Sequence, residues 1–195
     1  MLILASASKA RLELLESVGI TPDKILNTNI DETPKKSEKP LEYVSRIAFE
    51  KNKTVKKKKS EIVLTADTVV ALGRRIVQKP NNKDEALYFL NLLSGRRHKV
   101  YTSICIFSNE KYYQKTVVTT LKMKRLSEDE KKYYLLSDEW KGKAGGYSIQ
   151  GVASYFFPFI SGSYSNVVGL PLTETVGMLI GIGFKIPNFL NGFKN

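Results

Sequence analysis

The hydrophobic pattern at the start of the chain predicts a strand that runs directly into a helix. Residues 2–5 (LILA) form an apolar run, and Ser6 or Ser8 is a suitable N-cap because a short hydroxyl accepts the free amides of a first turn. Gly19 is a typical C-terminal stop. This path from strand to turn to helix is common in phosphate-binding α/β domains. The apolar stripe of the predicted helix consists of Leu12, Leu15 and Val18.

A second amphipathic pattern begins at Pro40, a residue that suits the first turn of a helix. Lys51 falls on the apolar face of this predicted helix. Its ammonium group therefore either extends past the core to water or reaches into a cleft. The apolar residues of that face are Leu41, Val44, Ile47, Ala48 and Val55.

Further along, strands and helices follow in mixed order, which favours an α/β or α+β fold with a mixed sheet. Residues 61–72 read as an apolar strand interrupted by Asp67, and Ser127 with Glu130 forms a capping box at a later helix start. No linker or repeat divides the chain, so residues 1–195 are expected to form a single domain. The other predicted elements are a returning strand at 76–80, a helix at 83–94 closed by Gly95, a long hairpin at 98–107 and 112–126, a strand at 154–161 and a helix at 171–183.

Composition and charge narrow the class of protein. The net charge of +12 invites a nucleic-acid hypothesis, but much of the excess is the lysine run 56–59 at the end of a predicted helix. No zinc-finger spacing or RNP-like motif accompanies it, so we expect no nucleic-acid partner. No apolar run is long enough for a membrane span and no signal-like segment is present, which predicts a cytoplasmic protein without membrane contact. The single cysteine, Cys105, excludes an internal disulfide and is expected to be buried and inert.

Familiar catalytic motifs are missing from the sequence. There is no P-loop, HExxH, CxxC or GxGxxG after a strand. Because His98 is the only histidine, a serine or cysteine triad is not expected, and a structural role suits it better. Any chemistry must then come from carboxylates and cations.

Lys9 and Arg11 lie in the first turn of the first predicted helix, where the partial positive charge of the helix disfavours cations. Either both side chains extend into water at small cost, or an anion offsets them. Free amides, the Ser8 hydroxyl and a guanidinium together make a cradle for phosphate. If Arg11 serves only this purpose, Arg11→Ala should weaken phosphate binding and leave the melting temperature unchanged or slightly raised.

Asp67 is the most informative carboxylate, because an ionised carboxylate inside an apolar strand must be paired. A salt bridge, a divalent metal or a proton-transfer task would each account for it. Asp31 and Glu32 lie in a loop after the second apparent strand of the chain, and hard oxygen ligands of this kind suit Mg²⁺ or Mn²⁺ together with substrate phosphates. The groups that together favour phosphate-ester chemistry are Ser8, Arg11, Lys51 and Lys79 for anion binding, with Glu32 and Asp67 as carboxylates.

Eight short segments in order resemble the Maf (septum-formation) family of nucleoside triphosphate pyrophosphatases. They are LASASKAR, IDETP, AFEKN, TADTVV, QKP, LSGRRHKVYT, KAGGYSIQG and GSYSNVVGLPL, and the match extends from residue 4 to about 176. The resemblance implies a mixed sheet flanked by helices, similar to the inosine triphosphate pyrophosphatases, with two lobes around a cleft. It also implies a homodimer and the metal-dependent cleavage of a nucleoside triphosphate to the monophosphate and pyrophosphate. In the family this activity is associated with removal of non-canonical nucleotides and restraint of cell division.

The resemblance also implies roles for single residues. Gln150, expected at a strand end, matches the base-reading position of the branch similar to dTTP/UTP pyrophosphatases, which indicates dTTP, UTP or modified analogues as substrate. Ala10 departs from that branch, which usually carries an arginine there. By resemblance, substrate binding falls on Ser6, Ser8, Arg11 and Gln150, catalysis on Asp67 (the proton acceptor), Lys51 and Lys79, metal binding (Mg²⁺ or Mn²⁺) on Glu32 and Asp67, and specificity on Ala10, Thr68 and Gln150.

The implied reaction is in-line attack of water on the α-phosphorus, with pyrophosphate as the leaving group and cations stabilising the developing charge. Asp67 would orient or deprotonate the water, bind the metal, or do both. Two alternatives remain: a non-enzymatic, basic nucleic-acid-binding or division-regulating protein on the same fold, and a phosphatase that releases orthophosphate. The presence of both Glu32 and Asp67 disfavours the first, because a pure anion-binding module needs no carboxylates beside its phosphate site.

Overall fold

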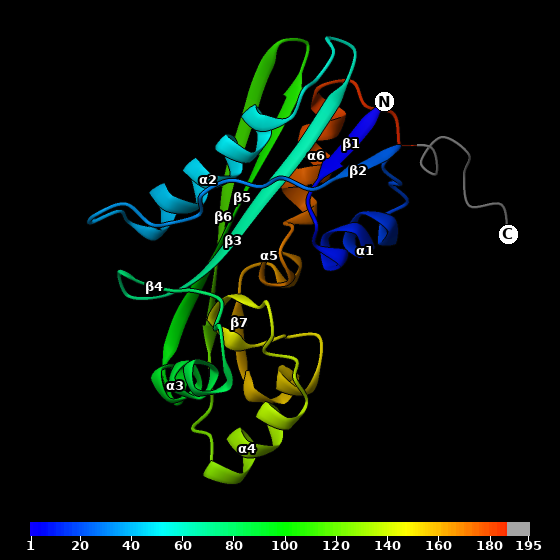
Figure 1. Cartoon of the computed structure of the whole chain (residues 1–195). Coiled ribbons are helices and arrows are strands. Elements are labelled where there is room, and N and C mark those ends of the chain that lie inside the picture. Colours follow the sequence, from blue (N-terminus) through cyan, green and yellow to red (C-terminus); the bar gives the residue numbers. More distant parts are fainter. Residues whose placement is uncertain (187–195) are drawn as a thin grey trace, which may run out of the picture.

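The chain folds around one seven-stranded mixed sheet with strand order β2-β1-β3-β5-β6-β7 and with β4 paired to β3 (Figure 1). The computed structural model describes residues 1–186. The strands are β1 (Leu2–Ala5), β2 (Lys24–Leu26), β3 (Ile62–Leu72), β4 (Arg75–Val77), β5 (Arg97–Ser108), β6 (Lys111–Lys122) and β7 (Phe159–Ser161). The helices are α1 (Lys9–Ser17), α2 (Pro40–Thr54), α3 (Lys83–Leu93), α4 (Glu128–Leu136), α5 (Tyr164–Val168) and α6 (Leu172–Gly181), with short 3₁₀ helices η1 (Ala144–Gly146) and η2 (Val152–Phe156).

One side of strand β3 is partly unpaired, because the two strands that pair with it there are much shorter than β3. β5 pairs antiparallel with β3 along residues 63–71. On the other edge, β1 runs parallel along residues 62–64 and β4 antiparallel along residues 70–72. In the described part of the chain no strand pairs with that edge at residues 65–69, so Asp67 lies in an opening beyond the carboxyl end of β1. Such openings are where ligands bind in α/β sheets.

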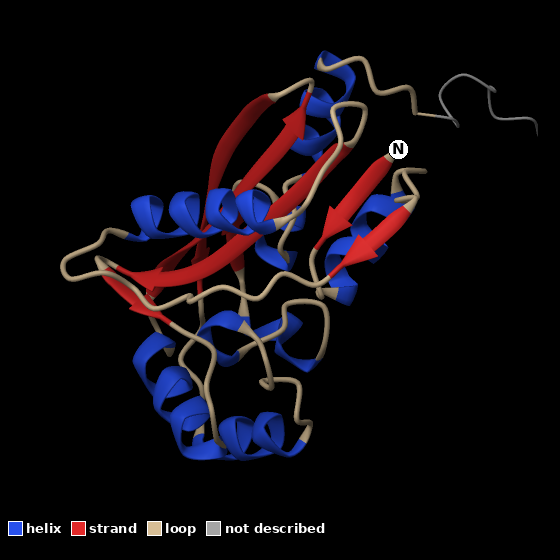
Figure 2. Ribbon diagram, turned by 45° about the horizontal axis from the view of Figure 1, so that its top comes forward, coloured by secondary structure: helices blue, strands red, loops and turns tan. Residues whose placement is uncertain are grey.

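Helices cover both faces of the sheet around this opening (Figure 2). Side chains alternate between faces along a strand, so Leu64 and Ala66 join the core formed with α1 and α6. Val69 instead packs on the opposite face against the apolar side of α2. By the same alternation Asp67 faces α2, while its neighbour Thr68 faces α1. The site therefore receives side chains from both faces of one strand.

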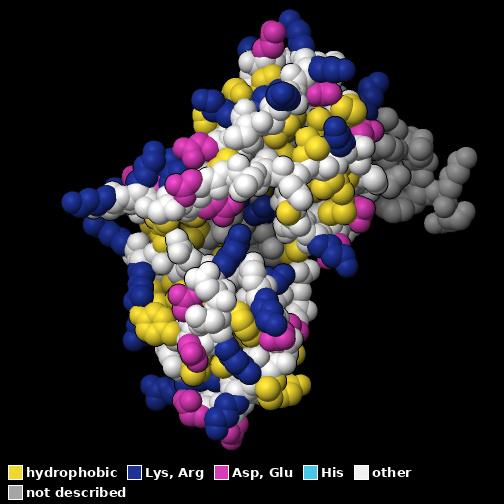
Figure 3. All heavy atoms as spheres, viewed as in Figure 1, with side chains coloured by type: hydrophobic (Ala, Val, Ile, Leu, Met, Phe, Trp, Pro, Cys, Tyr) yellow, Lys and Arg dark blue, Asp and Glu magenta, His cyan; other side chains and the backbone are white. Residues whose placement is uncertain are grey.

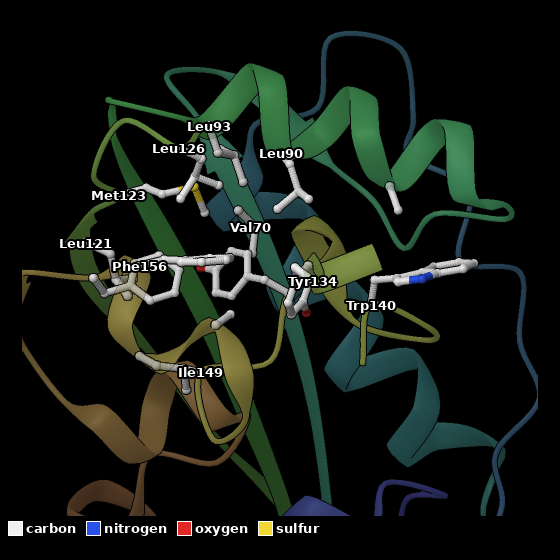
Figure 4. Close-up of a cluster of buried hydrophobic side chains, with 14 of the residues drawn as sticks. Val70, Leu90, Leu93, Leu121, Met123, Leu126, Tyr134, Trp140, Ile149 and Phe156 are labelled. Carbon is white, nitrogen blue, oxygen red and sulfur yellow. The ribbon is translucent and has the colours of Figure 1, made fainter. Parts of the chain in front are cut away.

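A second hydrophobic core lies at the far end of the long strands (Figure 4). Val70 of β3 packs there with Leu90 of α3, Tyr134 of α4, Trp140 of the turn after α4 and Phe156 of η2. We call residues 83–96 and 123–157 the helical lobe, and the rest of the described chain the sheet lobe. Residues of both lobes line the recesses described below.

The structure confirms the predicted fold class, a mixed sheet flanked by helices. The strand predicted at residues 154–161 is wrong: Ala153 and Phe156 are fully buried at one-turn spacing in η2, and only residues 159–161 pair with β6. The second helix ends at Thr54, before the lysine run 56–59. Leu41 is half exposed instead of joining the apolar face, which begins with the buried residues Pro40, Tyr43 and Val44.

Two expectations for single side chains, those of Cys105 and His98, are confirmed. Cys105 is fully buried, and burial raises the pKa of its thiol to about 12, so it stays protonated and inert. His98 is buried and pairs through Nε2 with the Tyr147 hydroxyl at 2.8 Å, a structural contact. Within residues 1–186 no helix is long and apolar enough to cross a membrane.

Candidate active site

The centre of the site is the ammonium group of Lys51, which lies between two carboxylates. Lys51 Nζ is 2.7 Å from Asp67 Oδ1 and 2.6 Å from Glu32 Oε1. Lys79 Nζ lies 3.8 Å from the other oxygen of Glu32. Three consecutive segments, the loop before α2, α2 itself and β3, are thus joined by one cation. Of the two paths open to Lys51, the structure shows the one into the cleft: only 7% of the residue is exposed.

Buried polar anchors hold α2 at the register that aims Lys51 at β3. The Asn52 carboxamide is fully buried and donates to the carbonyl oxygens of Val63 (2.9 Å) and Cys105 (3.0 Å). The Thr65 hydroxyl donates to the carbonyl of Ala48 at 2.8 Å. Since unpaired buried polar groups are costly, these bonds resist any sliding of the helix over the sheet.

The two carboxylates respond in opposite directions to their surroundings. Burial raises the pKa of Asp67 above its ordinary value, although the charges of Lys51 and Arg11 oppose this. Burial also acts on Glu32, but its hydrogen bond to Lys51 and the cations around it prevail and lower its pKa. Asp31, the adjacent acid, points away into solvent, where it accepts a hydrogen bond from the Thr33 amide. Of the acidic pair, only Glu32 belongs to the site.

Arg11 turns inward from α1 and is only 9% exposed. Nε donates to the carbonyl of Gly169 at 2.8 Å, Nη1 to the Ser6 hydroxyl at 3.0 Å and Nη2 to the Thr68 hydroxyl at 3.1 Å. Burial lowers the pKa of Arg11, with the charge of Asp67 opposing. Within residues 1–186 it forms no ion pair with a carboxylate. A buried guanidinium without a contacting anion suits a negatively charged ligand.

These contacts revise the expectation that Arg11→Ala leaves the apo protein unperturbed. We expect the variant to lose roughly 1–3 kcal/mol of stability, because buried acceptors on three segments lose a charged donor. For a chain of this length that is a fall of several degrees in melting temperature, measured by differential scanning calorimetry without ligand. Lys9→Ala, at the exposed start of the same helix, should melt like the wild type. An unchanged melting temperature in Arg11→Ala would restore the purely ligand-binding interpretation.

The other residues of the first turn divide between the site and solvent. Lys9 extends into water, with 88% of its side chain exposed, and pairs with Glu13. Ser8 is the N-cap of α1 but makes no side-chain cap hydrogen bond. Of the predicted phosphate cradle, Ser8 and Arg11 both line the outer recess. Lys9 lines the same recess, although its side chain is exposed to water.

Three adjoining recesses open at this centre. One lies between Glu32, Tyr43 and Lys79, and the two that Arg11 lines are called the inner and the outer recess. The inner recess extends from Asp67 and Thr68 into the helical lobe as far as Tyr147 and Ile149. The outer recess runs along the turn between β1 and α1 to Glu32. Figure 3 shows this face hollowed between the lobes, with Lys and Arg side chains and Asp and Glu side chains gathered around the hollow. Residues that line both recesses are Ser8, Ala10, Arg11, Lys51, Lys79, Gly142 and Lys143.

Gln150 also lines the inner recess, but its predicted position at a strand end is wrong. It lies exposed in a turn before η2, because the glycine-rich segment forms 3₁₀ and turn structure around η1 instead of a strand. The structure thus brings every residue predicted for the site to the inner or the outer recess. Ser6, although buried, lines the outer recess and also accepts a hydrogen bond from Arg11. Sequence reasoning missed Lys143 and Tyr147, although the segment KAGGYSIQG that contains both had been singled out.

The donor set fits a hard divalent cation that is completed by a ligand. Glu32 and Asp67 already direct one oxygen each at a single positive charge, the Lys51 ammonium. Within residues 1–186 no group of three or more His, Cys, Asp and Glu is arranged to hold a metal by itself. Mg²⁺ is characteristically bound by one or two carboxylates together with substrate phosphates, and this arrangement matches that pattern.

A mixed α/β sheet with carboxylates and cations at its open edge defines an α/β protein equipped to bind an anionic ligand. The chain belongs to the Maf family, whose model, described as Maf-like protein, matches residues 1–182. A relative named dTTP/UTP pyrophosphatase from Cereibacter sphaeroides is 52% identical over 185 residues, covering 95% of this chain and 96% of the relative. Relatives of the same name from Roseobacter denitrificans and Wolbachia pipientis wMel are 50% and 51% identical, over 95% and 91% of this chain and 98% and 91% of their own lengths.

Among solved structures, a HAM1 protein from Coxiella burnetii is similar at 15% identity, with a TM-score of 0.48, over 92% of this chain and 98% of that one. This likeness is weak, and the family membership follows from the sequence comparisons.

Proposed function

We propose that this chain is a nucleoside triphosphate pyrophosphatase that hydrolyses dTTP, UTP or modified analogues to the monophosphate and pyrophosphate. The observation that supports it most is the Lys51 ammonium shared by Glu32 and Asp67 at the junction of two recesses. Relatives about half identical over nearly the full chain carry the name dTTP/UTP pyrophosphatase. Site and relatives therefore agree on phosphate-anhydride chemistry.

The opposite pKa directions divide the work between the two carboxylates. Glu32, held ionised by the cations around it, suits cation binding. Asp67, whose pKa is raised by burial, is the better proton acceptor because a base is most effective when its pKa approaches the operating pH. In this proposal Asp67 takes the proton of the water that attacks the α-phosphorus, and the bond from that phosphorus to the pyrophosphate oxygen breaks.

Cations of the cleft would bind the phosphate chain and stabilise its developing charge. Arg11 supplies a rigid fork, whereas Lys79, with over half of its side chain exposed, can move onto the leaving pyrophosphate. A bound Mg²⁺ or Mn²⁺ on Glu32 and Asp67 would supply Lewis-acid neutralisation of the phosphate oxygens. In the cell, this activity would remove non-canonical nucleotides and restrain division. A cytoplasmic location and a homodimer are separate predictions.

A substrate panel tests the proposal. Purified protein is incubated with Mg²⁺ or Mn²⁺ and each common nucleoside triphosphate, together with methylated uracil analogues, and pyrophosphate and orthophosphate are measured separately. We expect pyrophosphate and the monophosphate in equal amounts. Orthophosphate as the main product would indicate a phosphatase, and no product with any nucleotide would favour the non-enzymatic alternative.

Gln150 is expected to set the ranking within that panel. A primary amide offers a donor and an acceptor that complement the carbonyl and imide N–H of uracil or thymine. A fixed site penalises a mismatched edge by about 1–3 kcal/mol for each buried group left unpaired. We therefore expect kcat/KM for dTTP and UTP to exceed that for dCTP and CTP, and Gln150→Ala to flatten this ranking more than it lowers turnover. If CTP or a purine triphosphate is the best substrate of the wild type, the base-reading role is wrong and the pyrophosphatase proposal stands.

A further inference from the structure

Lys143 lies on the helical-lobe side of the cleft, across from the residues already assigned to phosphate binding. It lines both the inner and the outer recess, as Arg11, Lys51 and Lys79 do. Arg11 and Lys51 belong to the sheet lobe, and Lys79 follows β4 at its border. Lys143 is therefore the cation that the helical lobe itself contributes to the junction of the recesses.

The backbone around Lys143 is fixed on three sides. Its amide donates to the Trp140 carbonyl at 3.2 Å, and its own carbonyl accepts from the Gly146 amide at 3.0 Å. The Gly145 amide donates to the carbonyl of Gln78, the residue before Lys79, at 3.0 Å. Trp140 is buried in the second core. The segment that carries Lys143 is thus tied to the segment that carries Lys79.

Gly145 lets this segment approach the sheet. Its φ is +72°, and a Cβ placed there would lie 2.9 Å from the Val70 side chain. Val70 is three residues beyond Asp67 on β3 and also lines the inner recess. This close approach, which leaves no room for a side chain at residue 145, places Lys143 beside the stretch of β3 that carries Asp67 and Val70.

Among the described residues, no ion pair balances the charge of Lys143. Within residues 1–186 no carboxylate forms an ion pair with it, whereas Lys141, two residues earlier, pairs with Asp138 at 2.7 Å and is exposed. Lys143 is partly buried. Four cations line both recesses, whereas each recess has one carboxylate, Asp67 in the inner and Glu32 in the outer. An anion bound at the junction would offset this excess of positive charge.

We propose that Lys143 is a substrate-binding residue whose ammonium contacts the phosphate chain from the helical lobe, opposite Arg11. This rests on the proposed function for the identity of the substrate, but the phosphate contact itself does not require hydrolysis. Binding a triphosphate between Arg11 and Lys143 would connect the two lobes through the ligand. Leu12, next to Arg11, packs against one hydrophobic core, and Ala144, next to Lys143, packs against the other.

Isothermal titration calorimetry with two probes in the presence of Mg²⁺ tests this contact. The probes are inorganic tripolyphosphate and α,β-imido-UTP, which resists cleavage between the α- and β-phosphorus. We expect Lys143→Met to weaken both by about 10- to 100-fold, the range of a charge-assisted hydrogen bond. Lys143→Arg should retain most of the affinity because it keeps the charge. The matched control, Lys141→Met, should leave both dissociation constants unchanged.

The outcomes separate this proposal from the proposed function. If Lys143→Met, folded by its melting curve, binds tripolyphosphate and the nucleotide like the wild type, the contact is refuted even when the wild type hydrolyses nucleotides normally. If Lys143→Met does not fold, Lys143→Gln is measured and the same criterion applies. If binding depends on Lys143 but no nucleotide is hydrolysed, the phosphate contact stands and the proposed function fails. If the wild type binds neither probe, the contact is refuted.

Discussion

Asp67→Asn is expected to lower kcat by about 10²- to 10⁴-fold, the contribution of a positioned general base, while the fold is kept. The residue is 5% exposed and its Oδ1 lies 2.7 Å from Lys51, so an amide of the same shape fits the space but cannot take a proton. Release of pyrophosphate from the best substrate of the panel, at saturating concentration, measures the effect. The matched control is Asp31→Asn, which neutralises an exposed carboxylate next to Glu32 and should leave kcat unchanged.

The same substitution carries a prediction for stability, with a definite sign. Because the folded state raises the pKa of Asp67, the folded protein binds a proton more tightly than the unfolded chain does. The wild type therefore loses stability as the pH rises above the ordinary carboxyl pKa of about 3.9 and through the raised value. Asp67→Asn lacks this loss, so its melting temperature relative to the wild type should increase from acidic to neutral pH. A variant that melts lower at neutral pH than at pH 4, relative to the wild type, would contradict the assignment, as would near-normal turnover.

The sequence predicts much of the site because its chemistry is local to strands and turns. An acid inside the apolar run 61–72 indicates a buried carboxylate that needs a partner. The alternation of side chains along the strand, with Val63 and Val69 on one face, then determines which face Asp67 takes. What the pattern could not decide was the path of Lys51, since extending to water and reaching a cleft have the same helical register. That choice depends on the unpaired stretch of β3, which is a property of the sheet and not of α2.

Arg11 shows a different limit. Its neighbours in sequence indicate a helix first turn, and from this the anion hypothesis follows. Its shortest hydrogen bond, however, is to the carbonyl of Gly169, 158 residues away. Gly169 has a φ of +131° directly after α5, a conformation set by the end of that helix. No local pattern reports such a contact, which is why a structural role for Arg11 and the position of Lys143 emerge only from the fold.

Lys51→Met is expected to destabilise the protein by about 3–5 kcal/mol at neutral pH, because it removes the cation from a buried pair and leaves Asp67 charged without its contact. For a chain of this length that is roughly 6–20 °C in melting temperature. Loss of the ammonium raises the pKa of Asp67 further, so the deficit should shrink toward pH 4, where the carboxyl takes a proton. Lys53→Met, exposed in the same last turn of α2, is the matched control and should melt within a degree or two of the wild type.

Added Mg²⁺ distinguishes a role of the Lys51 charge from a packing role of its hydrocarbon chain. In Lys51→Met the two carboxylates that converged on one cation are left facing each other, and a divalent ion added alone should raise the melting temperature of this variant more than that of the wild type. Adding Asp67→Asn to Lys51→Met should recover part of the lost stability and abolish the extra Mg²⁺ shift, because the buried uncompensated charge is gone. A Lys51→Met deficit that is the same at pH 4 and pH 8, or a Mg²⁺ shift no larger than that of the wild type, would show that Lys51 acts through its hydrocarbon chain alone and that Glu32 and Asp67 do not form a cation site.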